Sequence, residues 1–427
     1  MIAAILFGLF CVLLLMSVPI AVALGSASAI ALFVAGKVSN TYIPQALVTS
    51  IDSFPLMAVP FFILAGDIMA RGGLSERLLK VGGVLFGRFR GGMAIIAVVT
   101  CMFFAAISGS GPATVAAVGS ILLPVMAREG YRPAFSTGLV ASSGCLGVII
   151  PPSVPMIIYA ASANVSVSGM FLAGIVPGLL IAFGLIAYAL WQARRDGIRA
   201  TGEDQTARDV FAAIWEAKWA LLAPGIILGG IYGGIFTPTE AAAVGVIYGL
   251  VVSMLIYREL SFADLYRSIA QSALTTGTVM VIVGTATIFG RVLTIERIPV
   301  ILAESMTTIV ENPIVLLLLI NLLLLVVGTF LETLAAIIIL TPILLPVALA
   351  IGVDPTHFGI VMIVNLAIGM ITPPLGLNLF IGARVGKVPI EKLIPAMPPF
   401  VLTMVLILLA LTYIPALSLA LPSWASN

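Results

Sequence analysis

Two short polar motifs interrupt the apolar stretches of this chain. They are SGSGP at residues 108–112 and GTFLET at residues 328–333, and about forty residues after each comes a proline pair, at residues 151–152 and 373–374. Irregular backbone leaves peptide carbonyls unpaired, which is tolerated inside a membrane only where protein or water covers them. Unpaired carbonyls beside hydroxyl groups are hard oxygen ligands, the kind that suits a cation such as sodium.

The hydroxyl side chains next to these motifs would add ligands to such a site. They are Ser108, Ser110, Thr114, Thr333 and Thr372. Helix N-termini at the broken ends carry partial positive charge, which favours an anion nearby. The pattern predicts an oxygen-rich, weakly charged pocket for a monovalent cation and an anion.

The composition places these motifs in a polytopic, all-α membrane protein. Of 427 residues, 61% are hydrophobic and 9% are charged, and the mean hydropathy is +1.23. A soluble domain carries about 25% charged residues, so a soluble enzyme and a secreted disulfide scaffold are disfavoured. The net charge of +2 is too small for a nucleic-acid partner. The single histidine, His357, excludes a His-rich metal or haem site, and Cys11, Cys101 and Cys145 are expected to be buried thiols.

Helical membrane spans need about 20 apolar residues, and several stretches meet this length. They are 52–70, 134–163, 169–193, 219–236, 239–257, 273–293, 355–383 and 395–421. Residues 2–36 form either one long span or two short ones. Residues 91–127 and 313–351 each have the length of two short helices with a turn-forming middle, which predicts two helical hairpins.

The basic residues favour hairpins that enter and leave on the same side of the membrane. With that layout, 17 of the 20 lysines and arginines fall in loops on one face. Short basic loops stay in the cytoplasm, so the C-terminus is expected outside. Counting either hairpin as a full crossing would scatter the basic loops over both faces. We therefore expect the two hairpins to enter from opposite faces.

The chain also matches itself when it is shifted by 222 residues. The shift aligns Pro124 with Pro346, Pro133 with Pro355, Gly130 with Gly352, Gly147 with Gly369, and the two proline pairs with each other. Because the two copies would face opposite sides of the membrane, this is an inverted repeat, which is typical of secondary transporters.

The resulting organisation has five parts. They are 1–51 with the N-terminal span or spans, 52–163 as the first repeat with hairpin 91–127 and broken helix 134–163, 164–272 with scaffold spans and a cytoplasmic surface helix over 200–218, 273–385 as the second repeat with hairpin 313–351 and broken helix 355–383, and 386–427 with the C-terminal span.

Several motifs, in this order and spacing, resemble the large membrane subunit of tripartite ATP-independent periplasmic (TRAP) transporters. They are PFFILAG at 60–66, FFAAISGSGPAT at 103–114, GVIIPPS at 147–153, TPTEAA at 237–242 and TPPLG at 372–376. The resemblance implies sodium-driven uptake of organic acids across a bacterial or archaeal cytoplasmic membrane by an elevator motion. It also implies two partners, a soluble periplasmic binding protein and a small four-helix membrane subunit, which we expect on a separate chain.

The resemblance also implies two sodium sites. The first would use Ser108, Ser110, Gly147, Ile150 and Pro152, and the second would use Gly328, Thr333, Gly369, Thr372 and Pro374. The candidates for substrate binding are Ser153, Arg291, Glu332, Asn365 and Asn378. No organic cofactor is expected.

The roles of these polar candidates stay open in the sequence. Glu332 either caps the returning helix of the second hairpin or serves as a substrate or proton site. Arg291 either binds a substrate carboxylate or extends to the outer interface. Asn365 and Asn378 either reach the cavity or satisfy loosened backbone.

Two acidic residues elsewhere have simpler explanations. Asp67 and Arg71 are four residues apart on one span, which predicts an ion pair within a helix. Glu240 follows TPT at residues 237–239 and is expected to cap a helix.

The predicted function is a subunit that couples inward sodium flow to the uptake of a small organic anion. The alternative is a carboxylate carrier of the same architecture that needs no binding protein and uses sodium or protons. No nucleotide motif, haem signature or catalytic triad is present, which disfavours an enzyme. Broken helices at mid-membrane predict an occluded site, which disfavours a channel. The substrate could be a C4-dicarboxylate, a sialic acid, another sugar acid or a keto acid.

Overall fold

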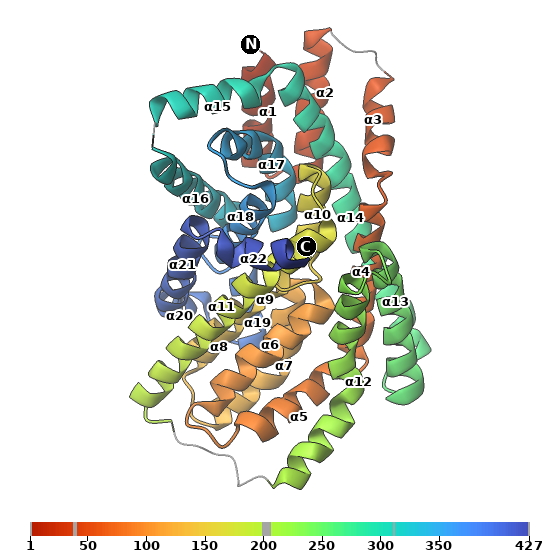
Figure 1. Cartoon of the computed structure of the whole chain (residues 1–427), viewed down its shortest axis with the longest axis vertical. Coiled ribbons are helices and arrows are strands. Elements are labelled where there is room, and N and C mark those ends of the chain that lie inside the picture. The colour runs from red at the N-terminus through yellow and green to blue at the C-terminus, as the bar shows by residue number, and fades with distance from the viewer. Residues whose placement is uncertain (1, 37–40, 199–205, 311, 426–427) are drawn as a thin grey trace.

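The computed structural model describes residues 2–36, 41–198, 206–310 and 312–425, and all regular structure in these ranges is helical. Seven of the described helices are long and apolar enough to cross a membrane, or up to ten spans exist if each bent pair counts as one. Figure 1 shows that the helices cross the molecule at different inclinations, with α13 and α14 steep and α11 oblique.

The first half of the chain contains the helices that surround the first polar motif. They are α1 (Ile2–Leu15), α2 (Ile20–Ala35), α3 (Tyr42–Ile51), η1 (Pro55–Met57), α4 (Ala58–Arg71), α5 (Leu74–Phe86), α6 (Gly92–Ser108), α7 (Gly111–Arg128), α8 (Pro133–Gly144), α9 (Leu146–Ile149), α10 (Val154–Ala163) and α11 (Val167–Arg195).

The second half contains the helices that surround the second motif. They are α12 (Ala207–Tyr232), α13 (Pro238–Leu250), η2 (Val251–Ile256), α14 (Phe262–Ile295), α15 (Ile298–Ile309), α16 (Pro313–Phe330), α17 (Thr333–Ala350), α18 (Pro355–Gly369), α19 (Leu377–Gly386), α20 (Ile390–Leu393), η3 (Ile394–Ala396), α21 (Pro398–Tyr413) and α22 (Ala416–Ala425).

The helix boundaries follow the 222-residue shift closely. Helix α7 and helix α17 begin and end at positions that differ by 222, and α8 and α18 both begin at the aligned prolines. Gly130 and Gly352, which follow α7 and α17, have φ angles of +84° and +78°, a conformation that favours glycine. Both proline pairs contain a cis peptide bond. In Figure 1, α5 and the hairpin that follows it lie toward the lower end, whereas α15 and its hairpin lie toward the upper end.

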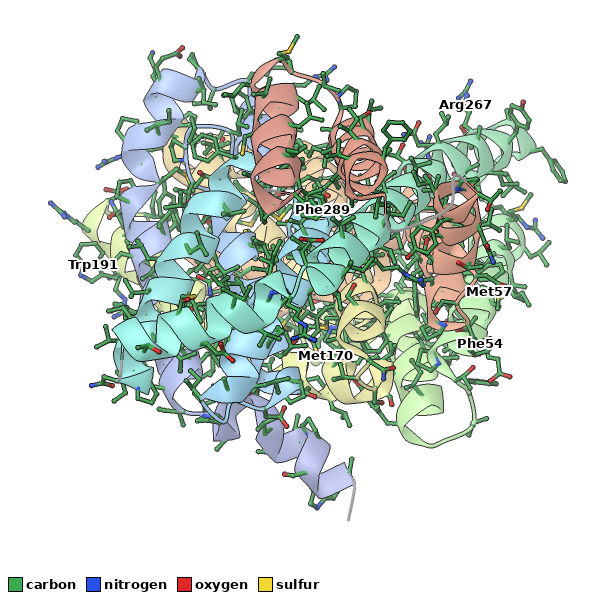
Figure 2. All side chains as sticks on the ribbon, turned by 90° about the horizontal axis from the view of Figure 1, so that it is seen from above. Phe54, Met57, Met170, Trp191, Arg267 and Phe289 are labelled. Carbon is green, nitrogen blue, oxygen red and sulfur yellow. The ribbon has the colours of Figure 1, made fainter. Side chains whose placement is uncertain are left out.

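Residues 2–36 form two short helices. Helix α1 ends before Ser17, which has a φ of +60°, and Pro19 then starts α2 because proline suits the beginning of a helix. Helix α2, with 16 residues, is about 24 Å long and thus shorter than the roughly 30 Å hydrocarbon core. The ring of Phe289 on α14 packs on Phe7 and Phe10 of α1, with ring centroids 5.7 and 5.5 Å apart. Figure 2 shows Phe289 inside the molecule and Trp191 at its edge.

Two expected elements differ from the structure. The surface helix expected over 200–218 is not separate: residues 199–205 lie outside the described residues, and residues 207–218 are the first turns of α12. No glycine or proline interrupts the chain between 207 and 223, so the helix continues without a break. The single span expected over 395–421 is also wrong, because the chain leaves the helix at Ile414 and Pro415 before α22 begins.

The packing around α4 and α14 repeats in the two halves. Helix α13 packs against α4, and α2 packs against α14. The 222-residue shift relates α2 to α13 and the α3–α4 segment to α14, so these are the same contact made twice. In the first of them, a Cβ on Gly249 of α13 would lie 3.1 Å from Met69, which shows how closely the helices approach.

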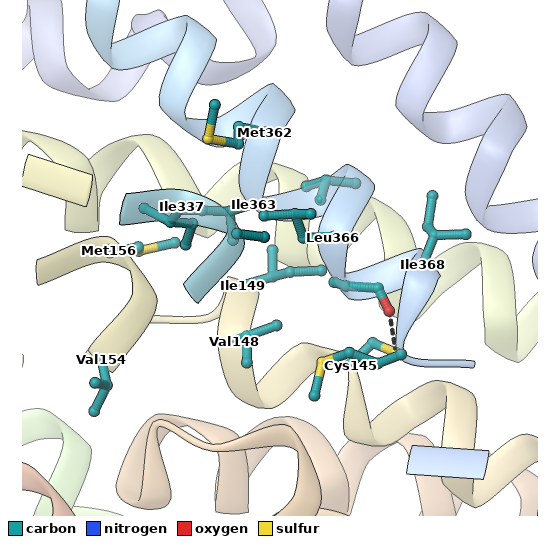
Figure 3. Close-up of a cluster of buried hydrophobic side chains, with 14 of the residues drawn as sticks. Cys145, Val148, Ile149, Val154, Met156, Ile337, Met362, Ile363, Leu366 and Ile368 are labelled. Atoms are coloured by element: carbon teal, nitrogen blue, oxygen red, sulfur yellow. Dashed lines mark hydrogen bonds between the residues drawn. The ribbon is translucent and has the colours of Figure 1, made fainter. Parts of the chain in front are cut away.

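The two halves meet in a buried cluster of apolar side chains (Figure 3). At its centre, the Sγ of Cys145 donates a hydrogen bond to the carbonyl oxygen of Ala367 at 3.0 Å, and these two residues are 222 positions apart. Met156, Ile337 and Leu366 pack in the same cluster. Cys101 and Cys145 are buried as expected, whereas Cys11 is exposed.

Candidate functional site

The first polar motif forms the turn between α6 and α7, which we call the first tip (residues 108–111). Gly109 has a φ of +59°, which glycine adopts without strain. Ser110 is the N-cap of α7. The hydroxyl oxygens of Ser108 and Thr114 lie 3.2 Å apart, and the Thr114 hydroxyl donates to the Ser110 carbonyl at 2.7 Å. Hydroxyl and carbonyl oxygens therefore gather at this turn.

The first tip contacts the first break, residues 150–153. A Cβ placed on Gly147 would lie 2.5 Å from the carbonyl oxygen of Ser110, and one on Gly109 would lie 2.9 Å from that of Pro152. Only glycines allow this approach of backbone to backbone. The structure thus brings four of the five residues of the first predicted sodium site together.

The fifth residue of that site has a different neighbour. The side chain of Ile150 packs on α11, where a Cβ on Gly178 would lie 2.5 Å from it. Ser153, a candidate for substrate binding, donates its hydroxyl to the Val148 carbonyl at 2.7 Å and thereby satisfies one of the carbonyls freed by the break.

The second motif forms the turn between α16 and α17, which we call the second tip (residues 330–333). Glu332 is the N-cap of α17, and its carboxylate accepts hydrogen bonds from the backbone N–H groups of Leu334 and Ala335 at 2.9 and 3.2 Å. The structure therefore shows the capping role of Glu332.

The end of α16, just before the second tip, lies against the end of α18, just before the second break (residues 370–376), through a close contact of two glycines. A Cβ on Gly369 would overlap the carbonyl group of Gly328. Thr333 is buried, and its hydroxyl makes no hydrogen bond within the described residues. The Thr372 hydroxyl instead donates to the Ile368 carbonyl at 2.8 Å. Thr372 and Pro374 line none of the cavities described below.

Both tips, the second break and the residues that flank the first break meet at one cavity of about 260 Å³, which we call the central cavity. Helices α4 and α14 form the remaining wall. The lining residues are Ile63, Gly109, Ser110, Pro112, Val148, Val154, Pro155, Thr275, Val279, Glu332, Thr333, Leu334 and Met370. The oxygen-bearing side chains among them come from three segments of the chain, namely the first tip, α14 and the second tip.

Three helices, α7, α10 and α17, begin at the wall of this cavity. Their N-termini contribute partial positive charge, but the Glu332 carboxylate already occupies that of α17. The α10 N-terminus receives no side-chain cap. The cavity thus offers hydroxyl groups, peptide dipoles and one carboxylate, which can hold a small polar solute.

The second tip borders another cavity, of about 340 Å³, on its other side. Its lining comes from residues 328–333 and residues 370–380, and no residue of α4 or α14 contributes to it. We call it the side cavity. Phe330, Leu375 and Phe380 make its wall largely apolar.

The two asparagine candidates lie behind the central cavity and do not line it. Asn378 is buried against α8, where its Nδ2 donates to the Ala141 carbonyl at 3.3 Å. Asn365 donates to the Oδ1 of Asn321 at 2.7 Å and to the Val361 carbonyl at 2.8 Å. The side-chain oxygens of Asn365 and Asn378 are buried without a hydrogen-bond partner.

Arg291 lies in a separate cavity of about 340 Å³, which we call the upper cavity. Helices α3, α10, α14 and α17 enclose it, and the Arg291 guanidinium donates to the Tyr42 hydroxyl at 3.4 Å. A third cavity of about 340 Å³, the lower cavity, lies between the first tip and helices α4 and α14. Asp67 lines it and pairs with Arg71 at 2.9 Å, which confirms the predicted ion pair.

Several residues of the site carry no signal in the sequence. Thr275 and Val279 belong to a long apolar helix, and nothing in their spacing marks them as part of a cavity. Gly66 is a partial exception, since it ends the PFFILAG motif. A Cβ on Gly66 would lie 2.9 Å from the Cα of Ser108, so α4 rests directly on the first tip. The cap predicted at Glu240 is confirmed by a capping box with Thr237.

An all-helical chain with this many apolar helices, and with polar turns gathered around an internal cavity, defines a multi-pass membrane protein. Within the described ranges, no three His, Cys, Asp or Glu side chains come close enough to hold a metal ion.

Comparison with known proteins identifies the family. Residues 7–417 match the family model described as "Tripartite ATP-independent periplasmic transporter, DctM component". The chain therefore belongs to the large permease family of TRAP transporters, and it is a solute-transport subunit that passes several times through the inner membrane.

Curated relatives with similar sequences are named transporters of several anions. The chain is 50% identical over 97% of its length to the isethionate TRAP transporter permease protein DctMQ of Oleidesulfovibrio alaskensis, and it spans 65% of that relative. It is 44% identical to the C4-dicarboxylate TRAP transporter large permease protein DctM of Pseudomonas aeruginosa, over 87% of both chains. It is 38% identical to the sialic acid TRAP transporter large permease protein SiaM of Vibrio cholerae, over 88% of both chains.

A solved structure has a similar fold. It is the YdaH transporter of Alcanivorax borkumensis, with a TM-score of 0.62 and 18% sequence identity, and the match covers 90% of this chain and 88% of that one.

Proposed function

We propose that this subunit couples inward sodium flow to the uptake of a small organic acid anion. A periplasmic binding protein delivers the anion, and a small four-helix membrane subunit completes the transporter. The central cavity carries this proposal, because both tips, the second break, the residues that flank the first break and the helices α4 and α14 all reach it. A solute held there contacts elements from both repeats, between which an alternating-access transporter holds its substrate.

The two hairpins are proposed to be re-entrant parts of an inverted repeat. The helix boundaries that recur after 222 residues support this relation. The opposite positions of α5 and α15 in Figure 1 support opposite directions of entry. Irregular backbone at both tips is then covered by protein, as it must be inside a membrane.

Sodium is proposed to bind at the two contacts between a tip and a break. At the first contact, Gly109 lies against the carbonyl of Pro152, and the hydroxyls of its neighbours Ser108 and Ser110 are the proposed side-chain ligands. At the second, the free hydroxyl of Thr333 lies near the contact of Gly328 with Gly369. These ligands are neutral oxygens, which suit a monovalent cation.

The upper and lower cavities support an elevator motion. We call α1–α4 and α12–α14 the scaffold, and α6–α10 and α16–α19 the carrier. The shift of 222 relates Ser50 and Ser53 of the scaffold to Ser272 and Thr275. Ser272 and Thr275 face the first tip in the lower cavity, but Ser50 and Ser53 do not face the second tip.

Instead, Ser50 and Ser53 share the upper cavity with Ile338 and Pro342, which lie roughly one and a half and two and a half turns beyond the second tip on α17. The carrier is therefore displaced toward the lower end of the scaffold. In the opposite state of the transporter, the second repeat takes the position that the first repeat has here. The carrier is then displaced toward the upper end, and the second tip reaches the level of Ser50.

The substrate is proposed to be a small anion with a carboxylate or sulfonate group. The names of relatives that transport isethionate, C4-dicarboxylates and sialic acid support this class. The capping carboxylate of Glu332 in the central cavity favours solutes that also carry hydroxyl groups, because a carboxylate accepts hydrogen bonds from them.

The test is uptake into proteoliposomes that contain the large subunit, the small subunit and the binding protein. Radiolabelled isethionate and succinate are the first probes, with sodium or proton gradients imposed separately. We expect uptake only with a sodium gradient and only when all three components are present. Uptake by the large subunit alone would favour the autonomous carrier, and uptake driven only by protons would overturn sodium coupling.

The sodium sites are tested with Ser108→Leu and Thr333→Leu. Each bulky apolar side chain should abolish sodium-driven uptake while the protein remains folded in detergent. Gly277→Ala is the matched control, because a Cβ at this position meets no atom within 4 Å. Full uptake in either leucine variant would remove that residue from the proposal.

A further inference from the structure

The upper cavity carries a feature that the proposed transport cycle does not use. Arg291 stands on α14, in the scaffold, and its side chain is exposed to this cavity. Its guanidinium donates to the Tyr42 hydroxyl, and no carboxylate lies within ion-pair distance of it among the described residues. Asp52, next to the lining residue Ser53, does not itself line the cavity. Among the described residues, Arg291 is therefore a positive charge in this cavity without a paired carboxylate.

The hydroxyl groups that line this cavity are of two kinds. Those of Thr287 and Thr294 already donate to carbonyls of their own helix, at 2.8 and 2.9 Å. Ser53 and Ser162 line the same cavity, and among the described residues their hydroxyls have no hydrogen-bond partner. Ser53 belongs to the scaffold and Ser162 to the carrier, so the free donors stand on both sides of the space.

The repeat-related lower cavity lacks this charge. The position related to Arg291 by the shift of 222 is Met69, which is fully buried. The charged group that lines the lower cavity is Asp67, and it is paired with Arg71. The two repeat-related cavities therefore differ in charge, because the upper one contains an arginine and the lower one contains an aspartate that is paired with an arginine.

We infer that the upper cavity is an anion-capture site, distinct from the central cavity. A carboxylate or sulfonate group binds the Arg291 guanidinium, which presents several N–H donors in a planar arrangement. Ser53 and Ser162 donate to the remaining oxygens. Because Arg291 belongs to the scaffold, the captured anion waits while the carrier moves, and it enters the central cavity when the second tip reaches this level.

This inference rests on the proposed function for its role in transport, but the site itself can be tested without transport. Thr287→Cys places a thiol one helical turn from Arg291, in a Cys11→Ser background, since Cys101 and Cys145 are buried. The thiol is labelled with an anionic methanethiosulfonate, which carries a sulfonate, and with a cationic one, which carries a trimethylammonium group. The ratio of the two rates reports the local potential.

Adding Arg291→Gln should lower the ratio of the anionic to the cationic labelling rate about tenfold. The positive charge of Arg291 attracts the anionic reagent and repels the cationic one at short range, so its loss changes both rates. The matched reporter is Thr275→Cys in the lower cavity. It is about 24 Å from Arg291 along α14, beyond the screening length, and its ratio should change less than twofold. A ratio at Thr287→Cys that stays within twofold would overturn the inference.

Anion occupancy is tested with the same reporter. Isethionate or succinate should slow labelling of Thr287→Cys when Arg291 is present and should not slow it after Arg291→Gln. In the three-component uptake assay, Arg291→Gln should raise the half-saturating anion concentration about tenfold, and Arg291→Lys should raise it less. If the wild type transports none of the anions, the proposed function fails, while the labelling ratio still decides whether the cavity attracts anions.

Discussion

The two hairpin tips share a backbone design but have different surroundings. The first tip lies against Gly66 of α4, and together with α4 and α14 it lines the lower cavity. The second tip opens instead to the side cavity, which is lined entirely by its own half of the chain. The caps differ as well, since the neutral Ser110 corresponds to the charged Glu332. Glycine and proline positions thus define the repeated backbone, and the side chains define which tip engages the scaffold.

The strongest way to test this shared backbone is to fill the glycine contacts between tip and break. Gly369→Ala would place a methyl group onto the Gly328 carbonyl, and Gly147→Ala would place one 2.5 Å from the Ser110 carbonyl. We expect each to cost about 3 kcal/mol of folding free energy, the upper part of the usual range for overpacking. Denaturant unfolding in detergent measures it.

Gly277→Ala serves as the control for both variants and should leave the stability unchanged or slightly raised, since alanine favours helix. If only one of the two contact glycines proves sensitive, the two breaks are not equivalent in backbone packing.

The different engagement of the tips by the scaffold is tested with Gly66→Ala. The added methyl group lies 2.9 Å from the Cα of Ser108, at the surface between scaffold and carrier. We expect uptake to fall about tenfold, equivalent to about 1.4 kcal/mol on the barrier to movement. Gly225→Ala on α12, which meets no atom within 4 Å, is the control. Normal uptake by the Gly66 variant would mean that the first tip does not slide along α4.

A buried polar pair distinguishes the second half from the first. Asn321 and Asn365 hydrogen-bond to each other, whereas the related positions in the first half are Val99 and Ser143. A double-mutant cycle with Asn321→Leu and Asn365→Leu should give a coupling energy of about 0.6–1.7 kcal/mol, as for other hydrogen bonds between membrane helices. A coupling near zero would show that the pair does not stabilise the second half.

A further effect of similar size concerns the caps. Glu332→Ala should destabilise the protein by about 1 kcal/mol, because two N–H groups of α17 lose their acceptor. Glu332→Ser copies the cap of the first tip and should recover most of this loss. Thermal unfolding of the three proteins measures the series. Equal losses in the alanine and serine variants would mean that the charge of Glu332, and not its capping, stabilises the tip.

The turns of this fold were predictable because glycine and proline impose them locally. Residues 108–112 form a turn and both proline pairs interrupt helices, as the sequence predicts, and the boundaries of α7 and α17 differ by the predicted 222 residues. Side chains that meet across the molecule were not predictable. Thr275 lines the central cavity with both tips because α14 passes beside them. Arg291 lines a different cavity because it lies about 24 Å further along the same helix.

The errors have a common physical cause. Hydrophobicity alone does not detect the break at Pro415, and the aromatic pattern of residues 206–218 fits a surface helix as well as the start of α12. Distinguishing these possibilities requires the tertiary contacts of each segment, which no single stretch of sequence contains.

The hydrogen bond between Cys145 and Ala367 joins two positions that the shift of 222 residues relates. A two-fold rotation has its axis midway between each pair of residues that it exchanges, so the axis of the proposed inverted repeat passes through this contact. Because the bond joins the thiol of one half to the backbone of the other, a change at Cys145 acts on both halves at once.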